Sequence, residues 1–79
     1  MTGNQLQAAR SLLGLSQADV AAAAGLSIPT IKRAEGKSAV AVSAATLAVI
    51  RSALETAGVD FIEENGGGAG VRLRMRAGI

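Results

Sequence analysis

The sequence predicts a mainly α protein, a small helical bundle followed by a C-terminal β-hairpin. Up to Gly58, residues that cap and end helices separate stretches in which apolar side chains recur at helical spacing. Beyond Gly58 the pattern alternates, in VDFI and again in VRLRM, and the intervening NGGGAG has the composition of a turn. We therefore divide the chain into a helical domain, residues 1–57, and a hairpin, residues 58–79, which packs on the helices or mediates dimerisation.

The first predicted helix lies near the N-terminus. Asn4, with Gln7 three residues later, can cap a helix that runs to about Leu13. The apolar residues of this segment are three and four positions apart, so they share one face. Gly14 then ends the helix, because glycine adopts backbone conformations that other residues avoid.

A turn at Gly25 separates the next two predicted helices. Ser16 and Asp19 have the spacing of a capping box, which predicts the start of an alanine-rich helix. Gly25 ends that helix in the left-handed conformation, which a residue without a Cβ atom adopts easily. Ser27 caps the third helix, and Pro29 fits its first turn because the missing N–H would have no partner there.

The third helix, which Gly36 ends, has two different faces. At about 100° per residue, Ile31 and Ala34 fall on the side that faces a core. The other side gathers apolar and cationic side chains, with a hydroxyl at its border: Ile28, Pro29, Lys32, Arg33 and Thr30. Helix capping and a solvated face are the alternative explanations of these residues. An isoleucine and a proline beside two cations nevertheless favour a binding surface.

Ser43 caps the longest predicted helix, and the alternating segments after Gly58 form the hairpin. A lone two-stranded hairpin is marginal in water, so its apolar side should be covered by the helices or by a second copy. We expect this side to make the dimer contact: Val59, Phe61, Val71, Leu73 and Met75. The other side carries Arg72, Arg74 and Arg76, which are solvated, pair with the acidic segment of the first strand, or touch DNA.

The composition excludes several classes of protein. The 79 residues include no cysteine and no histidine, so neither a disulfide framework nor a zinc site is available. Oligomerisation is the remaining way to reinforce a core this small, and we expect a homodimer. Because tyrosine and tryptophan are absent too, the usual pairs of nucleophile and base are missing. We expect no enzyme activity, no metal site and no cofactor.

Charge and hydropathy suggest where the chain acts. The longest apolar run, VAAAAGL, is far shorter than the roughly 20 residues of a membrane span. The N-terminus lacks the pattern of a signal peptide, so we expect a cytoplasmic protein with no membrane partner. The net charge of +2 is unevenly distributed, with basic ends and an acidic middle. This distribution suggests a polyanion bound by part of the surface.

The segment LLGLSQADVAAAAGLSIPTIKRAEGK, residues 12–37, resembles the DNA-binding helix-turn-helix of the phage-repressor-like (XRE) family. The resemblance rests on the spacing of LSQ, of the small residue and glycine at the turn, and of the isoleucine and glutamate in the third helix. It implies a lambda-repressor-like helical bundle with residues 28–35 as the recognition helix. The N-terminal residues of such a helix contact base edges in the major groove.

The resemblance also implies roles for individual residues. Apolar side chains can meet thymine methyl groups and an arginine can bind guanine, which gives the base-facing set Ile28, Pro29, Thr30 and Arg33. The implied phosphate-binding set is Ser16, Gln17, Ser27, Lys32, Lys37 and Ser38. Arg10 and Glu35 correspond to a structural ion pair that joins the first helix to the end of the third.

We therefore predict a sequence-specific transcriptional regulator, a dimeric repressor that binds double-stranded DNA at an inverted repeat. We expect a cytoplasmic protein of bacterial or phage origin that associates with the nucleoid. One alternative is an antitoxin or anti-regulator module that binds a protein through the basic hairpin. A nucleoid-type protein with little sequence preference fits less well, because a net charge of +2 is low for binding by charge alone.

Overall fold

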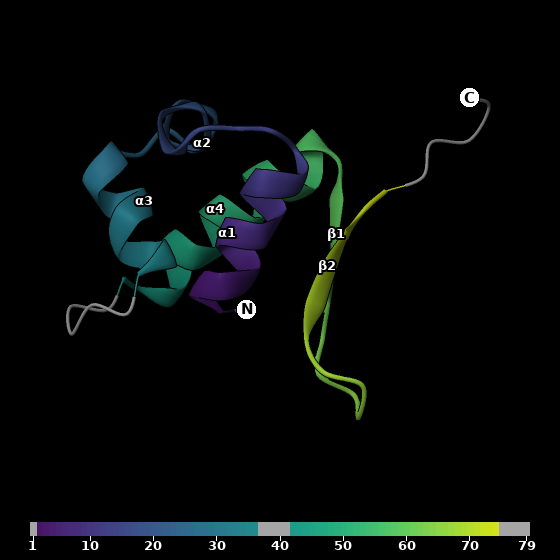
Figure 1. Cartoon of the computed structure of the whole chain (residues 1–79). Coiled ribbons are helices and arrows are strands. Elements are labelled where there is room, and N and C mark those ends of the chain that lie inside the picture. Colours follow the sequence, from purple (N-terminus) through teal and green to yellow (C-terminus); the bar gives the residue numbers. More distant parts are fainter. Residues whose placement is uncertain (1, 37–41, 75–79) are drawn as a thin grey trace.

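Helices form the first part of the chain and a hairpin the last, so the predicted fold class is confirmed (Figure 1). The computed structural model describes residues 2–36 and 42–74. Its elements are α1 (Gly3–Leu12), α2 (Gln17–Ala24), α3 (Ile28–Glu35), α4 (Ala44–Ala57), β1 (Val59–Ile62) and β2 (Gly70–Leu73). No helix among these residues is both long enough and apolar enough to cross a lipid bilayer.

The predicted helix boundaries agree with the structure except at the start of α1. Ser16, Ser27 and Ser43 cap the three later helices, and Gly25 adopts the left-handed conformation with φ 68°. The cap of α1 is Thr2, not Asn4. The Thr2 hydroxyl accepts a hydrogen bond from the backbone N–H of Gln5 at 3.1 Å, and the Gln5 side chain accepts one from the N–H of Thr2 at 2.8 Å. This reciprocal pair satisfies two backbone donors, which Asn4 does not do.

The hydrophobic core takes side chains from every helix and from the hairpin. Its fully buried members are Leu6, Ala9, Val20, Ala21, Ile31, Ala34, Ile50, Leu54 and Val59. Small buried side chains, Val20 and Ala21 in α2 and Ala34 in α3, suit the contacts of α2 with α4 and of α3 with α1. The share contributed by β1 means that the hairpin completes the core of the helical part and does not form a separate unit.

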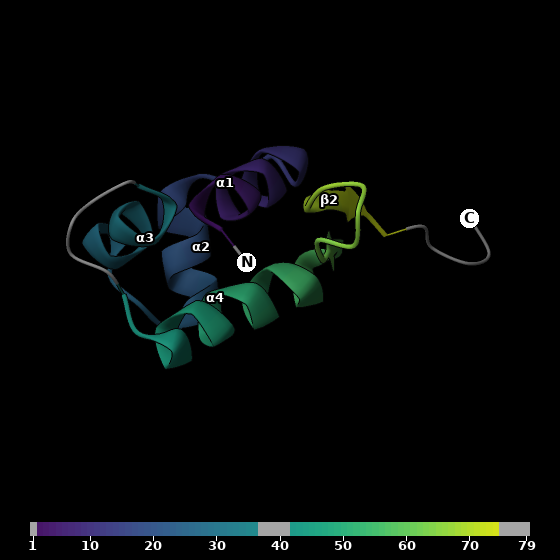
Figure 2. The same ribbon diagram turned by 90° about the horizontal axis from the view of Figure 1, so that it is seen from below.

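The hairpin docks at one end of the bundle, with β2 in contact with α1 and β1 in contact with α4 (Figure 2). The strands are antiparallel, with Val59 opposite Leu73 and Phe61 opposite Val71. The amide nitrogen of Gln5, a buried polar residue of α1, donates to the carbonyl oxygens of Ile62 at 3.3 Å and Gly70 at 3.1 Å. One side chain of α1 therefore joins both strands to the bundle.

The predicted dimer contacts need correction. Val59 is completely buried in the core of its own chain, so its assignment to a dimer interface is wrong. The helices of the same chain cover part of the apolar side of the hairpin. Phe61 and Val71 are half-buried against this core, whereas Leu73 remains about half exposed, at 51%. Met75 lies outside the described residues.

Candidate nucleic-acid interface

The turn between α2 and α3 is held by backbone geometry. With Gly25 in the left-handed region, the N–H of Leu26 donates to the carbonyl oxygen of Ala21 at 2.9 Å, which ends α2 and starts the turn. Ala21 is buried in the core, and α2 and α3 are in contact. The sequence thus produces two short helices in contact across a tight glycine turn.

The outward side of α3 is the side predicted from the sequence. Ile31 and Ala34 are buried, at 1% and 7% exposure, and fix the helix to the bundle. The opposite residues Ile28, Pro29, Lys32 and Arg33 are exposed, and Thr30 at the border is half-buried. Ile28 is 41% exposed, although a large apolar side chain gains free energy from burial. We call this surface of Ile28, Pro29, Thr30, Lys32 and Arg33 the α3 face.

The arginines outside the α3 face are paired within the described residues. Arg10 pairs with Glu35, Arg51 pairs with Glu55 and Glu63, and Arg72 and Arg74 share Asp60. Lys32 and Arg33 have no carboxylate partner among the residues that the structure describes. Among the described residues, the cations without any carboxylate partner therefore lie on α3, and a smaller positive excess remains on the hairpin, where two arginines share one carboxylate.

Arg10 and Glu35 form a bidentate ion pair between α1 and α3, with N···O distances of 2.8 and 3.0 Å. The carboxylate is 7% exposed, and its hydrogen bond to the guanidinium raises the pKa of Arg10 above its ordinary value. Arg10 also donates to the carbonyl oxygen of Leu15 at 3.1 Å, and the Gln17 amide donates to Glu35 at 3.2 Å. These contacts fix α3 against both earlier helices, and removing one partner of a buried pair typically costs about 3–5 kcal/mol.

The residues predicted to bind phosphate have structural roles as well. The hydroxyls of Ser16 and Ser27 accept the N–H groups of Asp19 and Thr30 at the starts of α2 and α3. The side chain of Gln17 is half-buried because of its bond to Glu35, which the sequence did not indicate. Lys37 and Ser38 lie outside the described residues.

Three residues that support this arrangement were missed in the sequence. Gly3 lies against the C-terminal end of α3, where a Cβ atom would come within 2.7 Å of the Glu35 carbonyl oxygen. Gln5 fastens the hairpin, and Glu64 accepts the N–H groups of Gly66 and Gly68 in the loop. Only Gln5 had a local signal, since Thr2 and Gln5 have the spacing of a capping box.

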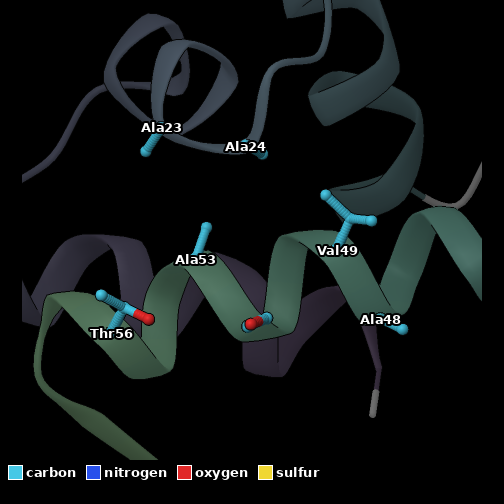
Figure 3. A pocket seen from close by; sticks show the side chains of 7 residues that line it. Ala23, Ala24, Ala48, Val49, Ala53 and Thr56 are labelled. Atoms are coloured by element: carbon cyan, nitrogen blue, oxygen red, sulfur yellow. The ribbon is translucent and has the colours of Figure 1, made fainter.

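An open groove between α2 and α4 is a second surface feature (Figure 3). It has a volume of about 520 Å³ and is lined by small side chains: Ala23, Ala24, Ala48, Val49, Ser52, Ala53 and Thr56. The methyl group of Ala53 points toward Ala23 across it. The only polar side chains in this lining are two hydroxyls, without any titratable group that could transfer a proton.

Comparison with models of known protein families gave no match, and comparison with curated protein sequences gave none.

Proposed function

We propose that this protein is a DNA-binding regulator that reads a specific sequence with the α3 face in the major groove. One observation carries the proposal: within the described residues, the cations that lack a carboxylate partner both lie on the outward side of α3. They adjoin exposed apolar side chains on a helix whose other side is locked into the core. A rigid helix with free cations and apolar groups suits a groove that offers both phosphates and base edges.

The side chains of the α3 face have distinct roles in this proposal. Arg33 binds guanine through its O6 and N7 atoms, and Lys32 binds a phosphate. Ile28 and Pro29, in the first turn, contact thymine methyl groups. The Thr30 hydroxyl already bonds to the Ser27 hydroxyl at 2.8 Å and lies 3.4 Å from an Arg33 nitrogen, which positions the guanidinium for this contact.

A dimer extends the proposal from one half-site to an operator. The resemblance to phage repressors favours a two-fold dimer whose recognition helices enter successive major grooves, about 34–36 Å apart. Such a protein acts as a repressor when its operator overlaps a promoter. Selection of bound DNA from a random pool tests both parts, since a dimer recovers an inverted repeat and a monomer recovers a single half-site.

The variant Arg33→Ala tests base reading. We expect its affinity for the selected operator to fall roughly 5- to 150-fold, which corresponds to about 1–3 kcal/mol for one bidentate guanine contact. Binding to random DNA should fall much less. The matched control is Arg72→Ala, which removes the same charge from the hairpin. Fluorescence anisotropy at fixed salt measures the six affinities of the original chain and the two variants for operator and random DNA.

Two results would contradict the proposal. Equal losses of Arg33→Ala on operator and random DNA would show that Arg33 contacts only the backbone. A random pool that yields no common sequence would instead favour binding without sequence preference.

A further inference from the structure

The outer edge of β2 has free backbone groups. The N–H of Arg74 donates to the carbonyl oxygen of Gly58 at 2.8 Å, and with the register this fixes which residues bond across the two strands. In an antiparallel pair these residues alternate with residues whose N–H and C=O groups point away from the partner strand. On β2 the outward residues are Val71 and Leu73. Neither has a backbone or side-chain hydrogen-bond partner on that side among the described residues.

One side of this edge is uncharged. A groove of about 360 Å³ runs between α1 and the start of β2. It is lined by Thr2, Asn4, Gln5, Ala8, Ala69, Gly70 and Val71, without a charged side chain. Leu73 continues the same side of the strand and is 51% exposed. A strand added at this edge would direct alternate side chains toward α1, where uncharged ones are favoured, and apolar ones are favoured beside Val71 and Leu73.

The other side of the edge is positively charged. The side chains of Arg72 and Arg74 are 70% and 47% exposed, and they share one carboxylate, that of Asp60, at 3.8 and 3.0 Å. Two guanidinium groups with a single anion leave net positive charge. β1 already shows the matching pattern, because its apolar Val59 and Phe61 face the bundle while Asp60 faces the arginines.

We propose that the outer edge of β2 binds an extended segment of another protein in which apolar and acidic side chains alternate. The free N–H and C=O groups of Val71 and Leu73 pair with the backbone of the segment. Its apolar side chains lie toward α1 and Leu73, and its carboxylates lie beside Arg72. The backbone groups select a strand, and the charge selects its sequence.

Charge also disfavours a second copy of β2 as the occupant. Two β2 strands side by side would gather the Arg72 and Arg74 side chains of both copies on one face. Like charges on adjacent strands are destabilising, whereas opposite charges are favourable. An acidic segment therefore complements this edge better than the same strand does.

This inference does not rest on DNA binding. The hairpin and α3 lie at opposite ends of the molecule in both views (Figures 1 and 2). A segment bound at β2 leaves the α3 face uncovered, so the two proposals can fail independently.

Amide hydrogen exchange with a short peptide that alternates valine and glutamate tests the proposal. We expect the amides of Val71 and Leu73 to exchange quickly in the free protein and to become protected by the peptide. The amide of Arg72, which bonds within the hairpin, should be slow in both states and serves as the internal control. The matching valine–lysine peptide should give little protection.

Two variants separate the contribution of backbone hydrogen bonds to peptide binding from that of charge. Leu73→Pro removes an outward N–H without removing a bond between β1 and β2, and we expect the peptide to bind about tenfold more weakly. Slow exchange at Arg72 verifies that the hairpin survives. Arg72→Ala should remove most of the preference for glutamate over lysine while its backbone is unchanged. Arg33→Ala should bind the peptide like the original chain.

The proposal is overturned if the peptide protects neither Val71 nor Leu73, or if the glutamate and lysine peptides bind equally. It is also overturned if these amides become protected without peptide as the protein concentration rises, since that result would assign the edge to a second copy.

Discussion

Among single residues, position 3 requires glycine because the neighbouring backbone leaves no room for a side chain. A Cβ atom at this position would lie 2.7 Å from the carbonyl oxygen of Glu35 and 2.9 Å from that of Ala34. Both neighbours are backbone atoms at the end of a helix, so they cannot rotate away as a flexible side chain would. The space left by glycine sets the distance between α1 and α3.

We predict that Gly3→Ala destabilises the protein, by about 1–3 kcal/mol in free energy of unfolding, as overpacking does. Helix propensity alone predicts the opposite, since alanine favours a helix by about 1 kcal/mol over glycine. The sign of the change in free energy of unfolding, measured by urea denaturation, therefore separates the two effects. In the loop, Gly67→Ala is the control, because its Cβ atom would meet nothing nearer than Asn65 Oδ1 at 4.0 Å. A more stable Gly3→Ala would refute the steric explanation.

Residues of the candidate site were predictable to different degrees. The outward position of Arg33 follows from helical periodicity within one segment, which is local information. The pairing of Arg10 with Glu35 follows from a resemblance over the whole helical region. The bond from Gln17 to Glu35, and the space at Gly3, depend on how helices far apart in sequence pack. No pattern in a single segment contains that information.

At the level of elements, helix ends were predictable because caps are local. Ser16, Ser27 and Ser43 each bond to a backbone N–H three residues later, a contact that depends only on nearby residues. At the start of α1 we predicted Asn4 as the cap, although Thr2 and Gln5 have capping-box spacing as well. The structure uses Thr2, whose reciprocal partner Gln5 also reaches the hairpin. A tertiary contact therefore accompanies the local choice.

The start of α2 gives a pH-dependent prediction. The pKa of Asp19 is lowered by its hydrogen bond from the backbone N–H of Ser16, at 2.8 Å, and by the bond to the Ser16 hydroxyl. Because the folded pKa lies below the unfolded one, the ionised carboxylate stabilises this helix start at pH values above the unfolded pKa. That contribution disappears as the pH falls through the folded pKa.

NMR titration measures this effect. The carboxyl carbon of Asp19 should titrate below the ordinary value of 3.8, and the amide of Ser16 should shift with it. In Asp19→Asn the amide should lose this titration. An Asp19 pKa at or above its ordinary value would contradict the observed capping box.

For the whole molecule, the sequence predicted the hairpin and left open whether it packs on the helices or on a second copy. The alternation of apolar and polar residues identifies the two strands from the sequence. The burial of Val59 depends instead on where the hairpin docks on the helices. A boundary at residue 58 marks a change of secondary structure and not the edge of a folding unit.

We expect a chain that ends at Gly58 to lose most of its stability. It lacks Val59 and also Phe61, whose ring lies 5.3 Å from the Arg51 guanidinium. Burying one valine contributes about 1.5–3 kcal/mol, against about 3–5 kcal/mol for a whole domain of this size. Thermal unfolding followed by circular dichroism should show a broad transition at a much lower temperature. A chain that ends at Arg74 is the control, and equal midpoints for both chains would contradict the role of the hairpin.

The position of Val59 in the core also affects how the protein is made. A ribosome releases the four helices before the strands, so the emerging polypeptide has its helical residues available while the core still lacks the valine of β1. Tertiary closure must wait until β2 has left the exit tunnel and can pair with β1. Stable folding of this protein therefore follows the synthesis of β2, and until then its apolar helix surfaces are open to chaperones.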